Sequence, residues 1–301
     1  MTLGDQAATA AAEKRAGLFA ALGAYLLWGM MPVYLKLFDG MSAAAVLAHR
    51  VLWSAVLLML VVIAIRKGAA LTAALSNPRL MGWLIFSALM IGANWYIYTW
   101  AVLNARVLDA SLGYFIQPII NTALGVVLLK ERLTAWQWLA VGLALTGIAI
   151  MTAAMGSLPL VSLGLAGAFA LYALARNRAA VDAITGLLIE TAILAPVALW
   201  WLMARAGGVF AQPLDLMLLL MLSSVVTSVP LALYGHAARR LTLSALGFLQ
   251  YIAPTCVFLL GVFAYGEAMD VGRLTAFAFI WAGLAAFSIG GFRGRRGRAK
   301  G

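Results

Sequence analysis

Ten long apolar segments occupy almost the whole chain and constrain its fold more than any other feature. Each contains about 20 predominantly apolar residues, the length that a helix needs to cross a bilayer. Short charged or turn-rich breaks separate them. The pattern predicts an all-α integral membrane protein with ten transmembrane helices. The segments cover approximately residues 17–37, 44–65, 79–102, 107–129, 134–154, 158–177, 183–204, 213–237, 242–264 and 272–292.

The composition supports this prediction and excludes several classes of protein. Of the 301 residues, 65% are apolar and only 10% are charged, too few to cover a soluble enzyme or nucleic-acid-binding protein. The single cysteine, Cys256, excludes a disulfide framework and a thiolate metal cluster, and two histidines are too few for a His-rich metal site. The chain has no P-loop motif, so an ATP-driven pump would need a separate nucleotide-binding partner. We therefore expect no metal and no cofactor.

The positions of Lys and Arg predict the orientation of the helices, because positively charged loops stay on the cytoplasmic side. With the N-terminus inside, sixteen basic residues fall in cytoplasmic loops and ends, while Arg106, Arg205 and Arg273 fall outside. This asymmetry predicts that both ends of the chain are cytoplasmic.

The two ends of the chain lie outside the predicted helices. Residues 1–16 are expected to form a short, disordered, Ala-rich cytoplasmic lead. A cleaved signal peptide is the alternative, but Asp5 and Glu13 dilute its positive region, and the first helix is too long and has no A-x-A site. Residues 293–301 form a basic cytoplasmic tail. We interpret this tail as a topology anchor with affinity for anionic lipid, in preference to a nucleic-acid-binding segment.

An internal repeat relates the two halves of the chain. The sequence ARVLDASLG at 105–113 matches RRLTLSALG at 239–247. Further along, a proline precedes a glutamate by thirteen residues in both copies, after a two-residue insertion in the second. These pairs are Pro118 with Glu131 and Pro254 with Glu267.

The repeat predicts two units of five helices, over residues 17–154 and 158–292. Five is an odd number, so the second unit must enter the membrane from the opposite side. Secondary transporters use such inverted repeats, binding substrate near the midplane between them and rocking to expose it to either side.

Polar and aromatic residues gather on single faces of several predicted helices. Polar groups inside a membrane are costly unless they face protein or water, so these faces are predicted to surround a substrate cavity. They combine neutral hydrogen-bonding groups with aromatic surfaces and lack a cluster of fixed charge, which suits a small neutral or zwitterionic solute with an apolar part. Packing between helices is the alternative for each of them. The predicted substrate-binding residues are Tyr25, Trp28, Asn94, Trp95, Tyr98, Tyr114, Gln117, Asn121, Thr227, Tyr234, Gln250 and Tyr251.

Two prolines are predicted to bend their helices, because proline removes a backbone hydrogen bond. Pro118 lies in helix 107–129 and Pro254 in helix 242–264. Their matched positions in inverted copies favour gating hinges, and the alternative is that they only shape the bundle.

Three ionisable residues lie about two turns inside predicted helices. His49 and Arg50 belong to helix 44–65, and Glu190 belongs to its counterpart, helix 183–204. One interpretation is a proton-coupling or substrate-charge site. The interpretation that we favour is that helix ends or loops near the interface satisfy them, because none is central.

Five strings of residues resemble the RarD-type branch of the drug/metabolite transporter superfamily, over nearly the whole chain. They are AYLLWG at 24–29, AHRVLWS at 48–54, LGYFIQP at 112–118, LKERL at 129–133 and GFLQYIAPT at 247–255. The resemblance implies ten helices in two EamA-type repeats and a bacterial inner-membrane location. It also implies efflux of small metabolites, since the superfamily includes amino acid exporters such as the YddG aromatic amino acid exporters. In that family helices 1, 3, 4, 6, 8 and 9 line the cavity, and these helices carry most of the polar faces above.

We interpret the chain as a secondary exporter of amino acids, aromatic ones included, or related metabolites by alternating access. Multidrug efflux is an alternative, for which a membrane-embedded anion would attract cations, and Glu190 is its candidate. A membrane enzyme would need a nucleophile or metal with an acid/base partner at one membrane face, and the sequence concentrates no such group. A helical scaffold would leave the repeat without a purpose. The expected partners are a small-molecule substrate and the lipid bilayer, with no nucleic acid.

Overall fold

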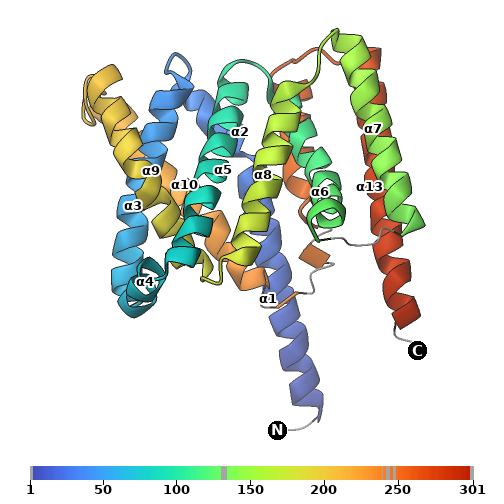
Figure 1. Ribbon diagram of the computed structural model, residues 1–301, viewed down its shortest axis with the longest axis horizontal. Coiled ribbons are helices and arrows are strands. Elements are labelled where there is room, and N and C mark those ends of the chain that lie inside the picture. The colour runs from blue at the N-terminus through green and yellow to red at the C-terminus, as the bar shows by residue number, and fades with distance from the viewer. Residues whose placement is uncertain (1–2, 130–133, 239, 242–244, 247–248, 299–301) are drawn as a thin grey trace.

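The computed structural model describes residues 3–129, 134–238, 240–241, 245–246 and 249–298, and its regular elements are all helices (Figure 1). The predicted all-α fold is therefore confirmed for this part of the chain. The elements are α1 (Leu3–Gly29), α2 (Met31–Leu35), η1 (Lys36–Phe38), α3 (Ala43–Ala64), α4 (Gly68–Leu75), α5 (Pro78–Leu103), α6 (Val107–Leu129), α7 (Ala135–Met155), α8 (Leu160–Arg178), α9 (Ala183–Arg205), α10 (Leu214–Ala238), α12 (Ile252–Leu259), η2 (Leu260–Ala264) and α13 (Val271–Arg298).

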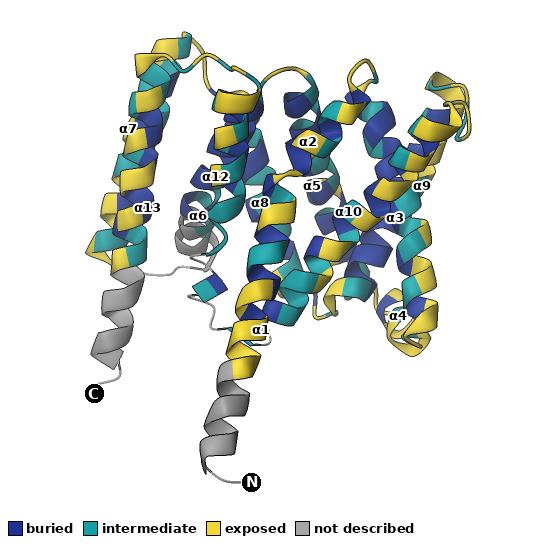
Figure 2. Ribbon diagram, turned by 180° about the vertical axis from the view of Figure 1, so that it is seen from behind, coloured by how far each residue is buried: buried dark blue, intermediate teal, exposed yellow. Residues whose placement is uncertain are grey.

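Eight helical segments of the described chain are long and apolar enough to cross a membrane, and Ile252–Ala264 is a shorter apolar helix. Their ends agree closely with the apolar segments in the sequence, as for α3, which was predicted over 44–65. Large apolar side chains such as Leu60, Ile63 and Met203 are exposed. Exposed positions recur along the outer helices of the bundle (Figure 2), as contact with lipid requires.

Polar caps explain why several helices begin where the apolar segments begin. Ser42, Asn77 and Asp182 each accept a hydrogen bond from the N–H three residues later, at 3.1–3.3 Å. The ammonium group of Lys67 lies 2.7 Å from the Asp182 carboxylate, which joins the turn between α3 and α4 to the start of α9. Partial burial raises the pKa of Asp182, but hydrogen bonds from Lys67 and Thr185 outweigh it, so the net pKa is lowered.

Both ends of the chain differ from the predictions. The lead at 1–16 was expected to be disordered, yet α1 is helical from Leu3. Its alanine-rich sequence favours helix, and a 2.5 Å ion pair between Glu13 and Arg240 attaches it to the second half of the chain. The helix α13 likewise continues to Arg298, beyond its predicted end at 292.

Two predicted helices are interrupted. The segment 17–37 divides after Gly29 into α1, α2 and η1, with Pro32 in the first turn of α2. In the segment 242–264, Ala245, Leu246 and Leu249 are helical, Gln250 and Tyr251 form a turn, and helix α12 then runs from Ile252 into the π-helical turn η2. Pro254 lacks the N–H that would bond to the carbonyl of Gln250, so the helix starts again around the proline.

The helices form a bundle with a helix pair at each edge (Figures 1 and 2). At one edge, α7 packs along α13, and Gly147 and Gly283 permit the close approach. A Cβ atom on Gly147 would lie 2.9 Å from the carbonyl oxygen of Ala276, and one on Gly283 would lie 3.0 Å from that of Ala140. At the other edge, α3 packs against α9. The helices that carry the predicted site lie between these pairs.

Candidate substrate-binding site

A group of buried and half-buried polar and aromatic side chains gathers where α3, α5, α6, α8 and α10 meet. We call Arg50, Asn94, Trp95, Tyr98, Tyr114, Phe169 and Thr227 the central group. Arg50 is 5% exposed, and its Nε donates a hydrogen bond to Thr227 Oγ1 at 3.0 Å. Its guanidinium carbon lies 4.9 Å from the ring centroid of Trp95, a cation–π contact. These contacts join α3 to α5 and α10.

Aromatic rings extend the central group from α5 to α8. The rings of Tyr98 and Tyr114 lie 5.6 Å apart, and that of Phe169 lies 6.3 Å from Tyr114. Tyr114 donates a hydrogen bond of 3.4 Å to the side-chain oxygen of Asn94, whose amide nitrogen donates to the carbonyl of Leu165 at 3.0 Å. The structure thus brings together five of the predicted residues, from α5, α6 and α10. Phe169 was not predicted, although its spacing of three from Tyr172 was a signal in the sequence.

Three other predicted residues form a separate aromatic group between α1 and α10. The ring centroids of Tyr25, Trp28 and Tyr234 lie 5.6–6.1 Å from one another, and the Tyr25 hydroxyl donates to the carbonyl of Leu246 at 3.3 Å. Such a cluster is stabilised by edge and tilted ring contacts.

The remaining predicted residues do not join either group through a hydrogen bond within the described chain. Gln117 and Asn121 follow Tyr114 along α6 and are half-buried. Gln250 is also half-buried, and Tyr251 packs toward the core that α6, α7 and α13 share.

The two prolines lie on neighbouring helices. Pro118 is in the interior of α6, and Pro254 is in the first turn of α12. The carbonyl of Pro254 accepts a 2.9 Å hydrogen bond from Ser111, which joins α6 to α12.

Arg50 and Glu190, for which partners at helix ends or in loops were favoured, contact side chains of neighbouring helices, and the charged partner of Glu190, Arg176, does lie in the last turn of α8. Glu190 is fully buried, accepts a hydrogen bond from Ser87 of α5, and lies 3.6 Å from the guanidinium of Arg176. His49 is also fully buried, and neither of its ring nitrogens has a hydrogen-bond partner among the described residues.

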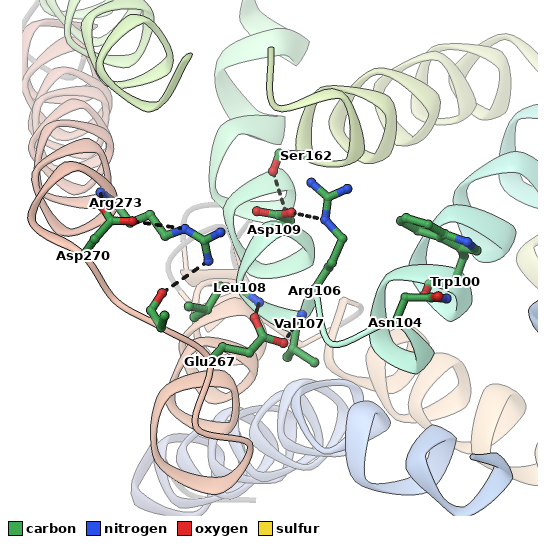
Figure 3. Close-up of polar contacts among 11 residues, drawn as sticks. Trp100, Asn104, Arg106, Val107, Leu108, Asp109, Ser162, Glu267, Asp270 and Arg273 are labelled. Atoms are coloured by element: carbon green, nitrogen blue, oxygen red, sulfur yellow. Dashed lines mark hydrogen bonds and ion pairs between the residues drawn. The ribbon is translucent and has the colours of Figure 1, made fainter. Parts of the chain in front are cut away.

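A polar network that the sequence did not predict surrounds the start of α6 (Figure 3). Both carboxylate oxygens of Glu267 accept hydrogen bonds from this helix terminus, from the N–H of Val107 at 2.5 Å and of Leu108 at 2.8 Å. Arg106 pairs with Asp109 at 2.6 Å. The signal in the sequence was the acidic residue that follows Pro254 by thirteen positions, but its distant partner could not be inferred.

Comparison with known proteins identifies the family. Residues 15–153 match the EamA-like transporter family. The protein RarD of Escherichia coli K12 is 44% identical over 92% of this chain and 95% of its own length. The chain belongs to the RarD-type branch of the EamA-like transporters.

Other relatives agree. An uncharacterised transporter of Vibrio cholerae is 40% identical over 93% of this chain and 94% of its own length. The chloramphenicol-sensitive protein RarD of Pseudomonas aeruginosa is 32% identical over 88% of this chain and 91% of its own length. A crystal structure of a protein with 19% identity has the same fold, with a TM-score of 0.58 over 90% of this chain and 96% of that one. This RarD-type chain is therefore a multi-pass transporter of the bacterial inner membrane and not an enzyme.

Proposed function

We propose that this RarD-type transporter exports amino acids, aromatic ones included, or related small metabolites by alternating access. The observation that carries the proposal is the central group. Its side chains come from α3, α5 and α6 of the first half and from α8 and α10 of the second half. A buried site shared by two halves is where an inverted-repeat transporter binds its substrate.

The proposed architecture has ten transmembrane helices and both ends in the cytoplasm. Its parts are the lead 1–16, the repeats 17–154 and 158–292, and the tail 293–301. Support comes from the eight spanning helices and from the 23-residue α6. The start of α1 and the end of α13 also lie at the same end of the bundle (Figure 1). Cytoplasmic and periplasmic reporter fusions after each helix test the arrangement, and a periplasmic C-terminus would contradict it.

Transport into proteoliposomes tests the function. Purified protein should mediate uptake and counterflow of labelled amino acids, and Trp95→Ala and Tyr98→Ala should slow both without lowering the amount of protein in the membrane. Trp200→Ala, which changes an exposed ring, is the matched control. If protein-containing vesicles move no amino acid faster than empty ones, the proposed substrates are wrong.

We keep Pro118 and Pro254 as proposed gating hinges. The hydrogen bond from Ser111 to the Pro254 carbonyl links the two proline-containing helices, so bending one would move the other. Alanine at either position should change the labelling of single cysteines from each membrane side in a Cys256→Ala background. Unchanged labelling and full transport in both variants would make the prolines static features.

The coupling and multidrug proposals rest on the buried ionisable residues. Of His49, Arg50 and Glu190, we propose His49 for proton coupling, because both of its ring nitrogens are enclosed without a partner in the described chain. His49→Gln should abolish the response of uptake to an imposed proton gradient, and an unchanged response would exclude this role. Multidrug efflux would need a free carboxylate in the membrane, whereas Glu190 pairs with Arg176.

A further inference from the structure

Arg50 holds a positive charge at a buried position where α3 contacts α5 and α10. It lies eight residues after the cap of α3 and is 5% exposed. Arginine inside a membrane protein costs free energy unless a partner compensates its charge, and such residues commonly face a substrate or ion pathway.

The partners that the protein supplies to Arg50 are all neutral. They are the hydroxyl of Thr227, which accepts from Nε, and the ring of Trp95. The phenols of Tyr98 and Tyr114 lie within electrostatic range. No Asp or Glu oxygen of the described residues lies within 4.0 Å of the guanidinium, although six other basic side chains make ion pairs. The charge of Arg50 therefore has no counter-ion in the described chain.

The guanidinium also has unused hydrogen-bond donors. Nε is the nitrogen that bonds to Thr227, while the two terminal nitrogens have no acceptor in the described chain. They are not among its fully enclosed unpaired atoms, so they keep some accessible surface. The planar fork of a guanidinium matches the two oxygens of a carboxylate, with two parallel charge-assisted hydrogen bonds.

Flat apolar surfaces lie beside this charge. The Arg50 guanidinium lies over the Trp95 ring, and the paired rings of Tyr98 and Tyr114 are part of the same group. A ligand that satisfies both features has a carboxylate for Arg50 and an apolar or aromatic part for the rings.

We propose that Arg50 binds the carboxylate of the transported solute, so that the substrates are organic acids or amino acids with an apolar or aromatic part. This inference rests on the proposed transport function and specifies its substrate class. It also changes the expectation from the sequence, because a site without fixed charge would accept neutral analogues equally well. A carboxylate entering the site supplies the missing counter-ion.

Matched ligands test the assignment on the purified full-length protein. The probes are L-phenylalanine and phenylacetate, which carry the carboxylate, and L-phenylalaninamide and phenylacetamide, which do not. Thermal stabilisation by each ligand reports its affinity, because a ligand that binds only the folded state raises the unfolding temperature. The variants are Arg50→Gln and the control Arg205→Gln, which removes an exposed arginine that also contacts a tryptophan, Trp201.

We expect at least one acid to stabilise the wild-type protein and its amide to have little effect. Arg50→Gln should weaken binding of that acid by about 10- to 100-fold, the size of a charge-assisted hydrogen-bonded contact, while Arg205→Gln should not. Equal stabilisation by acids and amides, no stabilisation by either acid, or an acid preference that survives Arg50→Gln would overturn the assignment. Stabilisation by inorganic phosphate as large as that by the acids would also overturn it, since the site would then bind anions in general.

A second measurement on the unmodified chain applies even if Arg50→Gln does not fold. Phenylglyoxal reacts with accessible arginines, and mass spectrometry should show that phenylacetate, but not phenylacetamide, protects Arg50. Equal labelling with and without the acid would contradict the proposal. Proteoliposomes distinguish failure of the carboxylate site from failure of the transport function. If the acid binds through Arg50 but is not transported, the transport function alone is contradicted. If the acid is transported equally well by Arg50→Gln, the carboxylate site alone is contradicted.

Discussion

Arg50 and Glu190 occupy corresponding places in the two halves of the chain, yet in the described chain only Glu190 has a partner of opposite charge. Each follows the cap of its helix, Ser42 or Asp182, by eight residues. Each also bonds to a hydroxyl group on a neighbouring helix. Glu190 pairs with Arg176, whereas Arg50 meets only neutral groups of the described chain.

This difference indicates that the buried charge of Glu190 supports the fold, whereas the buried charge of Arg50 is available to a solute. A paired charge loses stability when its partner is removed, because the remaining charge is left unpaired in an apolar interior. An unpaired charge has already incurred that cost, so its removal should harm binding more than folding. The comparison therefore separates a structural role for Glu190 from a binding role for Arg50.

The largest effect is expected from Arg176→Met, which leaves Glu190 buried and unpaired. Breaking a buried pair costs about 3–5 kcal/mol, and the lower end applies because 16% of the Arg176 side chain is exposed. Unfolding of the purified protein in a denaturing detergent measures the loss. Arg178→Met, an exposed arginine on the same helix, is the control, and adding Glu190→Gln should restore much of the stability. Equal stability of Arg176→Met and Arg178→Met would remove the structural role of the pair.

A smaller effect is expected from Gly186→Ala. Gly186 lies one turn before Glu190, and a Cβ atom there would collide with the guanidinium of Arg176, so the arginine must move. The far end of the arginine is flexible, so the loss of about 1–3 kcal/mol comes from weakening its pair with the buried Glu190. Gly167→Ala on α8 is the control, because nothing lies within 4 Å of the added atom. If Gly186→Ala and Gly167→Ala are equally stable in the same unfolding assay, the Arg176 guanidinium does not pack against Gly186.

Trp95→Leu tests the environment of the Arg50 charge. It should weaken the binding of phenylacetate by about threefold to thirtyfold. A cation–π contact contributes about 0.5–2 kcal/mol, and Trp95 both covers Arg50 and lies beside the proposed ligand. Thermal shifts over a range of phenylacetate concentrations give the affinity. Trp201→Leu, which removes the ring beneath the exposed Arg205, is the control and should bind normally. If Trp95→Leu binds phenylacetate with unchanged affinity, the Trp95 ring does not contribute to the binding site.

Much of the fold followed from the sequence, because the length of an apolar segment is a local property that a bilayer makes decisive. The interruptions near Pro32 and Pro254 were less predictable, since a proline can bend a helix or end it and the surroundings decide which. The alanine-rich lead was wrongly predicted to be disordered, because composition at a terminus did not show that Glu13 would meet Arg240.

The site was predicted less completely than the fold. Trp95, Tyr98 and Tyr114 were identified from their faces, because helical spacing is visible in a sequence. The partner of a charge is not visible in the same way. Whether Arg50 meets Thr227 or a carboxylate depends on the rotation of α10 against α3, which tertiary packing sets.

The smallest effect on stability is expected from Arg50→Met, and it tests the comparison most directly. Methionine fills a similar volume without charge, and replacing a buried charge by an apolar side chain is often neutral or stabilising. Loss of the hydrogen bond to Thr227 costs about 1 kcal/mol, and relief of the unpaired charge opposes it. The net change should therefore stay within about 1 kcal/mol in the assay used for Arg176→Met, while binding of the acid is lost. A loss as large as that of Arg176→Met would mean that Arg50 supports the fold as Arg176 does, and the two halves would then not differ in the way proposed.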